Sequence, residues 1–139
     1  MRKPHRRLDV LDRAECLALL GSVRLGRVAY NAHGAPRVEV VNFLLDGDGA
    51  VIRMGIGSRS AAVGRGGHFA LEADRLDETG DIGWNVTAIG PVRWVSDPAE
   101  FRRLDRLLIS SAPGDRSHLA RISFAQVFGR RLRAVAYDG

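Results

Sequence analysis

Cysteine is almost missing from this chain, because Cys16 is the only one among 139 residues. A single thiol cannot close a disulfide within the chain, and no Cys and His residues stand at the spacing of metal ligands. The sequence therefore excludes a disulfide framework, and we expect no metal site.

Long hydrophobic runs are missing as well. No apolar segment approaches the length of about 18 residues that spans a bilayer. The basic residues 1–8 are followed by Asp9 and Asp12 instead of the apolar stretch of a signal peptide. We therefore expect a cytoplasmic protein without a membrane partner.

The motifs of several enzyme classes are also lacking. The chain contains no P-loop, no GxSxG nucleophile elbow and no HExxH zinc motif. The four histidines are scattered along the chain, and none stands beside a residue that could orient it as an acid or base. We nominate no catalytic side chain, so any redox chemistry would have to come from a cofactor.

The basic charge is concentrated at the two ends of the chain. The net charge is +5, of which residues 1–7 carry +4, residues 130–139 carry +2 and the body between them carries −1. A nucleic-acid-binding module would instead carry its basic residues as a stripe on a folded element. This distribution argues against nucleic acid as a partner.

The sequence does contain the material of one ordinary globular domain. Its 45% hydrophobic and 27% charged residues suit a single core at this length. We assign residues 1–10 to a basic N-terminal tail and residues 11–139 to a single domain.

Apolar spacing and turn residues predict the secondary structure. We expect a helix over residues 8–20, with Asp12 and Glu15 as a capping box, and another that begins after Asp97. We expect strands at 23–30, 38–45, 50–56, 68–73, 82–95 (bent at Gly90) and within 119–135. Tight turns favour antiparallel pairing, so the fold class is mainly β, a small α+β barrel with short peripheral helices.

One local motif points to chemistry. The strand at 50–56 carries Arg53 and leads into Gly57, Ser58 and Arg59 at the start of a short helical segment. Two guanidinium groups, a hydroxyl and exposed backbone N–H groups could bind a phosphate. On the local sequence alone, a flexible turn with two solvated arginines is the preferred interpretation.

The order of the segments over residues 11–131 resembles the pyridoxamine 5'-phosphate oxidase-like family of FMN-binding split barrels, with its nitroimidazole reductase-like members. The resemblance rests on residues 17–20, 26–29, 36, 40–43, 46–49, 53, 57–59, 83–86, 90 and 129–131. It implies a six-stranded antiparallel split β-barrel with Greek-key topology that pairs as a homodimer. FMN would lie at the dimer interface, and the protein would be an oxidoreductase acting on a small molecule. Two alternatives stay open: a deazaflavin coenzyme in place of FMN, and a non-catalytic regulatory module that binds a flavin or deazaflavin.

The same resemblance assigns cofactor-binding residues in three segments. They are Val40, Val41, Asn42 and Phe43 beside the isoalloxazine ring, Arg53, Ser58 and Arg59 at the phosphate, and Trp84 and Asn85 approaching from the second subunit. Met54 stands where the family often has threonine, which removes one hydrogen bond to the phosphate. Without the family context, Trp84 is more simply a core residue. We expect the amide of Asn42 to be buried, where a flavin edge could supply its hydrogen-bond partners.

Overall fold

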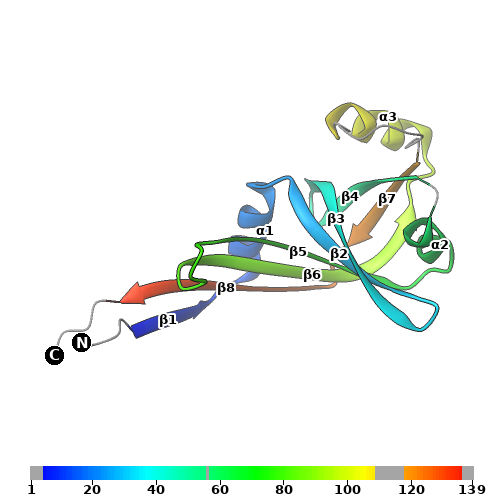
Figure 1. Cartoon of the computed structure of the whole chain (residues 1–139). Coiled ribbons are helices and arrows are strands. Elements are labelled where there is room, and N and C mark those ends of the chain that lie inside the picture. The colour runs from blue at the N-terminus through cyan, green and yellow to red at the C-terminus, as the bar shows by residue number, and fades with distance from the viewer. Residues whose placement is uncertain (1–4, 56, 109–117, 136–139) are drawn as a thin grey trace.

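The computed structural model describes residues 5–55, 57–108 and 118–135, which form eight strands and three helices. The strands are β1 (His5–Val10), β2 (Leu25–Ala32), β3 (Ala35–Asp46), β4 (Gly49–Met54), β5 (His68–Leu76), β6 (Gly83–Trp94), β7 (His118–Ser123) and β8 (Gln126–Val135). The helices are α1 (Arg13–Gly21), α2 (Ser58–Gly64) and α3 (Pro98–Leu107). Figure 1 shows the strands forming a barrel, and β8 and β1 extend the same sheet beyond β6, since β8 pairs with β6 and β1 pairs with β8.

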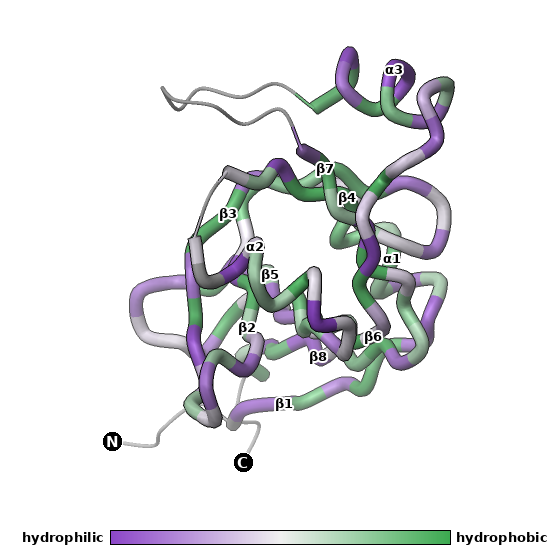
Figure 2. Tube along the Cα trace, turned by 90° about the vertical axis from the view of Figure 1, so that its right-hand side faces the viewer, coloured by the Kyte–Doolittle hydropathy of each residue, from purple (hydrophilic) through white to green (hydrophobic). Residues whose placement is uncertain are grey.

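Six of the strands close into an antiparallel barrel. The hydrogen-bonded order runs β6, β5, β2, β3, β4 and β7, and the pairing of β6 with β7 joins the two ends of this series. Figure 2, which looks along the barrel, shows the strands arranged as a ring. The six-stranded barrel expected from the sequence is therefore confirmed.

Strand β6 closes the barrel by changing neighbours at Gly90. Its first part pairs with β8, and Val92 to Trp94 pair with β7. A Cβ atom on Gly90 would overlap the carbonyl oxygen of Ser123, where β7 ends before β8. The absence of a side chain at this position thus permits the bend that the sequence predicts.

The N-terminal segment differs from the expected tail. Residues 1–4 lie outside the described residues, but His5–Val10 forms strand β1, which pairs antiparallel with residues 130–135 of β8. The first helix accordingly begins at Arg13, not at residue 8. The charged sequence suggested a tail. It gave no sign of a strand, because the residues that pair with this segment lie at the far end of the chain.

The helix starts and the tight turns follow their sequence signals. The side chains of Asp12 and Asp97 accept hydrogen bonds from the backbone N–H groups of Glu15 and Glu100, and so cap α1 and α3. His33 and Gly34 both have positive φ, as the two-residue turn between β2 and β3 requires. The strand expected to reach Ile56 is observed to Met54, and Ile56 lies outside the described residues.

The main hydrophobic core fills the barrel. It includes Leu20 and Cys16 of α1, and Ala62 and Val63 of α2, packed among inward-facing strand residues. Helices α1 and α2 lie on opposite sides of the barrel (Figure 1), so each brings apolar side chains to the core from its own side. No helix within the described residues is long and apolar enough to cross a membrane.

Helix α3 forms a second core on the outside of the barrel. Its Leu104 packs with Val51 of β4 and Leu119 of β7. Along β4 the side chains alternate, so Ala50, Ile52 and Met54 belong to the main core while Val51 faces the second core. This alternation places Arg53 on the same outward face as Val51.

Candidate functional site

Strand β3 divides the barrel by changing its neighbours midway. Residues 35–42 pair with β2, whereas residues 43–46 pair with β4. The backbone N–H of Phe43 donates to the Arg24 carbonyl, at the point where β3 turns from one neighbour to the other. Within the described part of the chain, residues 35–42 therefore have a strand partner on one edge alone, and we call the side of β3 beyond its unpaired edge the split.

Arg59 of α2 spans the split. Its Nη1 donates to Oε2 of Glu39 at 3.0 Å, and its Nε donates to the sulfur of Met54 at 3.1 Å. The Tyr30 hydroxyl donates to the other oxygen of Glu39, while the Tyr30 ring stacks on Phe69 at 5.0 Å between centroids. Arg59 is 16% exposed in this arrangement. A cation thus links the side chain of Glu39 on β3 to the end of β4.

Arg53 holds α3 from the outer face of β4. Its Nη1 donates to Oδ1 of Asp105 at 2.6 Å, and its Nη2 donates to the backbone carbonyls of Asp105 and Leu108 at 3.2 and 2.5 Å. The Nη2 of Arg59 donates to the backbone carbonyl of Arg53 at 3.5 Å. The two arginines expected at a phosphate are therefore close in space, but each also has structural partners of its own.

The four predicted residues of β3 lie at the turning point of that strand. Val41 and Phe43 are buried in the core, whereas Val40 and Asn42 are exposed on the outer face. The expectation that the Asn42 amide is buried is wrong, because strand alternation turns this side chain toward solvent. A backbone contact from this segment does not depend on the direction of its side chains. Ser58 is the first residue of α2, and its backbone position alone is described.

Trp84 and Asn85 lie away from the split, on β6. Trp84 is 8% exposed and belongs to the main core of its own chain. Trp84 is therefore a core residue, as its sequence position suggests when the family resemblance is left aside. Asn85 faces the outer side of the sheet, beside Asp74 of β5 and Arg130 of β8.

Three residues of the site were not predicted from the sequence: Glu39, Tyr30 and Asp105. Glu39 had a detectable signal, because it occupies an inward-facing position between Val38 and Val40, where an unpaired carboxylate would be costly. The roles of Tyr30 and Asp105 depend on contacts between segments far apart in the sequence, which spacing does not reveal.

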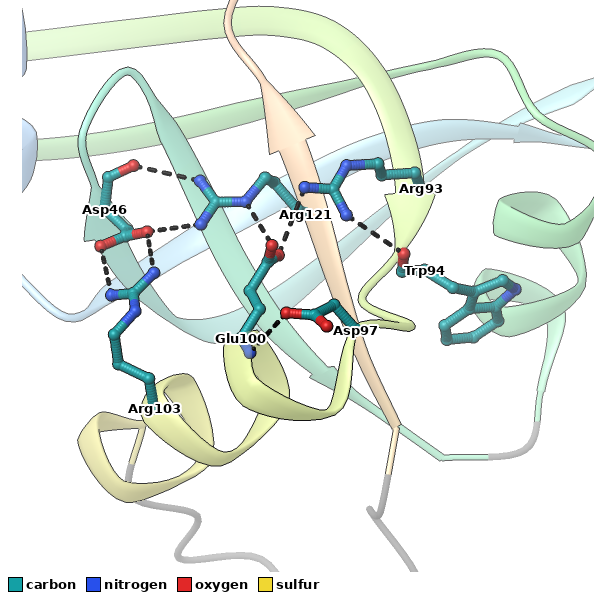
Figure 3. Close-up of polar contacts among 7 residues, drawn as sticks. All are labelled: Asp46, Arg93, Trp94, Asp97, Glu100, Arg103 and Arg121. Carbon is teal, nitrogen blue, oxygen red and sulfur yellow. Dashed lines mark hydrogen bonds and ion pairs between the residues drawn. The ribbon is translucent and has the colours of Figure 1, made fainter.

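An ion-pair cluster fixes α3 against the edge of the barrel (Figure 3). Both nitrogens of the Arg103 fork donate to Asp46 at 3.0 Å, and Arg121 of β7 also binds the Asp46 carboxylate. Hydrogen bonds from Arg103 and then Arg121 lower the pKa of Asp46 to about 2. Glu100 joins the cluster through Nε of Arg121 at 3.7 Å, and it also accepts a hydrogen bond from Arg93 at 3.2 Å. The position of α3, and with it the surroundings of Arg53, depends on these charges.

Exposed apolar side chains gather on the side of the sheet that is turned away from the barrel core. We call this surface the outer face. It is formed by the outward side chains of strands β1, β2, β3, β5, β6 and β8. Seven of the ten exposed large hydrophobic side chains in the described residues belong to it: Leu8, Val10, Leu25, Val38, Val40, Leu76 and Phe128. Exposed apolar side chains gathered on one sheet face in this number suit a contact with another protein.

A charged group lies in the middle of the outer face. Nη1 of Arg27 donates to Glu72 and to Asp74, each at 3.0 Å. Partial burial, together with the neighbouring Asp74 carboxylate, raises the pKa of Glu72. No three His, Cys, Asp or Glu side chains in the described part of the chain are grouped so that they could hold a metal ion.

Comparison with known proteins places this geometry in a family. Residues 12–131 match the family model described as pyridoxamine 5'-phosphate oxidase. The uncharacterized protein Rv0080 of Mycobacterium tuberculosis is 39% identical over 105 residues, which cover 70% of this chain and 68% of that protein.

Two solved structures show the same fold. A protein of Corynebacterium glutamicum superposes with a TM-score of 0.77 at 24% identity, covering 93% of this chain and all of that one. An FAD-binding protein of Mycobacterium smegmatis superposes with a TM-score of 0.69 at 26% identity, covering 91% of this chain and all of that one. The matched segment spans nearly the whole described barrel, and the resemblance seen in the sequence is confirmed: the chain belongs to the pyridoxamine 5'-phosphate oxidase family.

Proposed function

We propose that this protein is a flavin-dependent oxidoreductase that acts on a small molecule and holds FMN at the split, in a homodimer. The observation that carries the proposal is the free edge of β3. In an antiparallel strand, every second residue directs its N–H and C=O groups to the same side. Residues 35–42 use one side for β2, and the groups on the other side are available to the polar edge of a flavin ring.

The charges beside the split suit the phosphate of FMN. Arg59 has one ion-pair partner, Glu39, and its guanidinium group has more N–H donors than that pair uses. Arg53 lies on the neighbouring strand end, and the backbone of Gly57 and Ser58 connects the two. Arginine binds phosphate through paired, charge-assisted hydrogen bonds. We assign the phosphate to Arg59 first and to Arg53 second, because Arg53 is more fully engaged with α3.

The outer face supports the homodimer. Seven exposed hydrophobic side chains on one sheet face would be costly in an isolated chain, and a second copy related by a two-fold axis would cover them. Val40 and Asn42 lie on this face and on the strand that borders the split. A dimer formed here would bring the partner close to the same segment of β3.

When bound, the flavin would supply hydride or electron transfer, and the chain would supply position and electrostatics. The free edge of β3 would orient the ring, and Arg59 would hold the phosphate. Met54 and the apolar residues of α2, which are buried in the main core, would form an apolar floor for the site. The M. smegmatis relative at 26% identity is an FAD-binding protein, which supports a flavin as the cofactor class.

The absorbance spectrum of the purified full chain tests the proposal first. We expect flavin bands, or their appearance on titration with FMN, and tighter binding of FMN than of FAD or riboflavin. A band at shorter wavelength would identify a deazaflavin instead. A protein that binds none of these cofactors would contradict the proposal.

Reaction with reduced nicotinamide tests the enzymatic part. We expect loss of the flavin absorbance on adding reduced nicotinamide and its return in air. A flavin that stays oxidised under these conditions, and under chemical reductants small enough to reach it, would favour the non-catalytic module.

A further inference from the structure

A cleft lies on the outer face where α1 leads into β2. Its volume is about 620 Å³, within the range of small-molecule sites in proteins. It is lined by the 22–24 connection, by Leu25 to Arg27 of β2, by Val40 of β3, and by Asp74 and Arg75 of β5. The cleft thus adjoins the β3 segment that borders the split.

The charge of this cleft is positive, and its single acid is already bound. Arg24, Arg27 and Arg75 face one carboxylate among the lining residues, Asp74. Arg27 binds Asp74 and Glu72, each at 3.0 Å, and this group keeps a net charge of −1, so that together with Arg24 and Arg75 the five side chains carry a net charge of +1. Among the residues that the structure describes, Arg24 and Arg75 form no ion pair. Arg24 and Arg75 therefore line the cleft without an ion-pair partner of their own among the described residues.

Apart from Ser22, the remaining walls are apolar. Leu25 and Val40 are 60% and 64% exposed, and both line the cleft together with Val23. Apolar walls with a few charged groups at one end are typical of sites that bind a small molecule by its body and orient it by its charge. A second copy on the outer face would close the open side of this cleft and enclose such a molecule.

We propose that this cleft binds a small organic anion, with its apolar body against Leu25 and Val40 and its carboxylate or phosphate on Arg24 and Arg75. The inference rests on the proposed function in one respect: if a flavin is bound beside β3, small organic anions are the class of substrate that this cleft would bring to it. Arg27 has a different role, since it is already bound to Asp74 and Glu72. The anion group would be bound by charge-assisted hydrogen bonds.

Titration of the full chain with 2-naphthoate and with its neutral amide, 2-naphthamide, tests the cleft. The two probes share an apolar body and differ in charge. We expect naphthoate to bind at least tenfold more tightly than the amide. Arg24→Gln and Arg75→Gln should each reduce naphthoate affinity about tenfold and leave the amide unchanged, as the loss of one charge-assisted hydrogen bond predicts.

Arg102→Gln is the matched control, because Arg102 is an exposed arginine of α3, outside the cleft. This variant should bind naphthoate as the parent does. Equal affinity for the two probes, no binding of either, or the same loss in Arg102→Gln as in Arg24→Gln would overturn the proposal.

FMN titration of the same variants separates the cleft from the proposed flavin site. We expect Arg24→Gln and Arg75→Gln to bind FMN as the parent does. If FMN affinity fell with naphthoate affinity, the cleft would be part of the cofactor site and the inference would be wrong. If the parent bound no flavin but still discriminated naphthoate through Arg24 and Arg75, the proposed function would fail while the anion site stood.

Discussion

Arg59 and Arg53 differ in the hydrogen-bond and ion-pair partners that each guanidinium group already has. Arg59 balances one carboxylate, Glu39, at the split, whereas Arg53 binds a carboxylate and two carbonyls at the end of α3. Arg59→Ala should therefore weaken FMN about tenfold to a hundredfold through the lost phosphate contact. Riboflavin, which lacks the phosphate, should bind this variant and the parent equally. Equal FMN affinity in parent and variant would contradict the assignment.

Arg53→Ala should have two effects. We expect weaker FMN binding, as for Arg59→Ala, together with a lower melting temperature because α3 loses an anchor. Asp105→Asn is the matched control, since it weakens the Arg53 to Asp105 pair and keeps the guanidinium group. If Asp105→Asn reduced FMN affinity as much as Arg53→Ala does, Arg53 would act through α3 and not on the phosphate.

Asp46 ties part of the stability of the protein to pH. The pKa of Asp46 is lowered to about 2 in the folded state, so its contribution is complete above the unfolded pKa near 3.8 and is lost as the pH falls toward 2. Asp46→Asn should lower the free energy of unfolding by about 1–2 kcal/mol at neutral pH, after allowance for partial exposure. Urea titrations should show this difference shrinking between pH 4 and 2.5. A constant difference over that interval would mean that the charge of Asp46 contributes little.

At the scale of elements, the bend in β6 requires a residue without a side chain at position 90. Gly90→Ala would drive a Cβ atom into the Ser123 carbonyl oxygen, and backbone atoms cannot move aside as a flexible side chain can. We expect a loss of about 3 kcal/mol or more in the free energy of unfolding.

Gly64→Ala provides the comparison for this variant. A Cβ atom on Gly64, at the end of α2, would meet no atom within 4 Å. Its effect on stability in a denaturant titration should stay within about 1 kcal/mol. Similar losses in the two variants would show that β6 tolerates a side chain at its bend.

The sequence predicted those elements whose signals are local. Asp12 and Asp97 marked the helix starts, and the turn at His33 and Gly34 marked the hairpin. Strand β1 was missed because its pairing partner, β8, is distant in the sequence. The site was predicted in its segments but not in its geometry. The change of partner along β3 and the engagement of Arg53 by α3 arise from tertiary contacts that residue spacing does not encode.

At the scale of the whole molecule, the outer face should determine the oligomeric state. We expect a dimer by sedimentation at micromolar concentration. Val40→Asp would place a charge in the proposed interface and should shift the protein toward monomer, with weaker FMN binding. Leu107→Asp is the matched control, because Leu107 is 55% exposed but belongs to α3. A parent that is a monomer and still binds FMN would contradict the shared site.

The free edge of β3 also makes amide hydrogen exchange uneven along one strand. Between residues 37 and 42, the amides directed at β2 are hydrogen-bonded, and those directed at the split have no backbone acceptor within the described chain. Exchange followed by NMR should therefore alternate between slow and fast from one residue to the next. A flavin seated against this edge would slow the fast set and leave the slow set as it was. The strand would then report, amide by amide, which of its two sides the ligand touches.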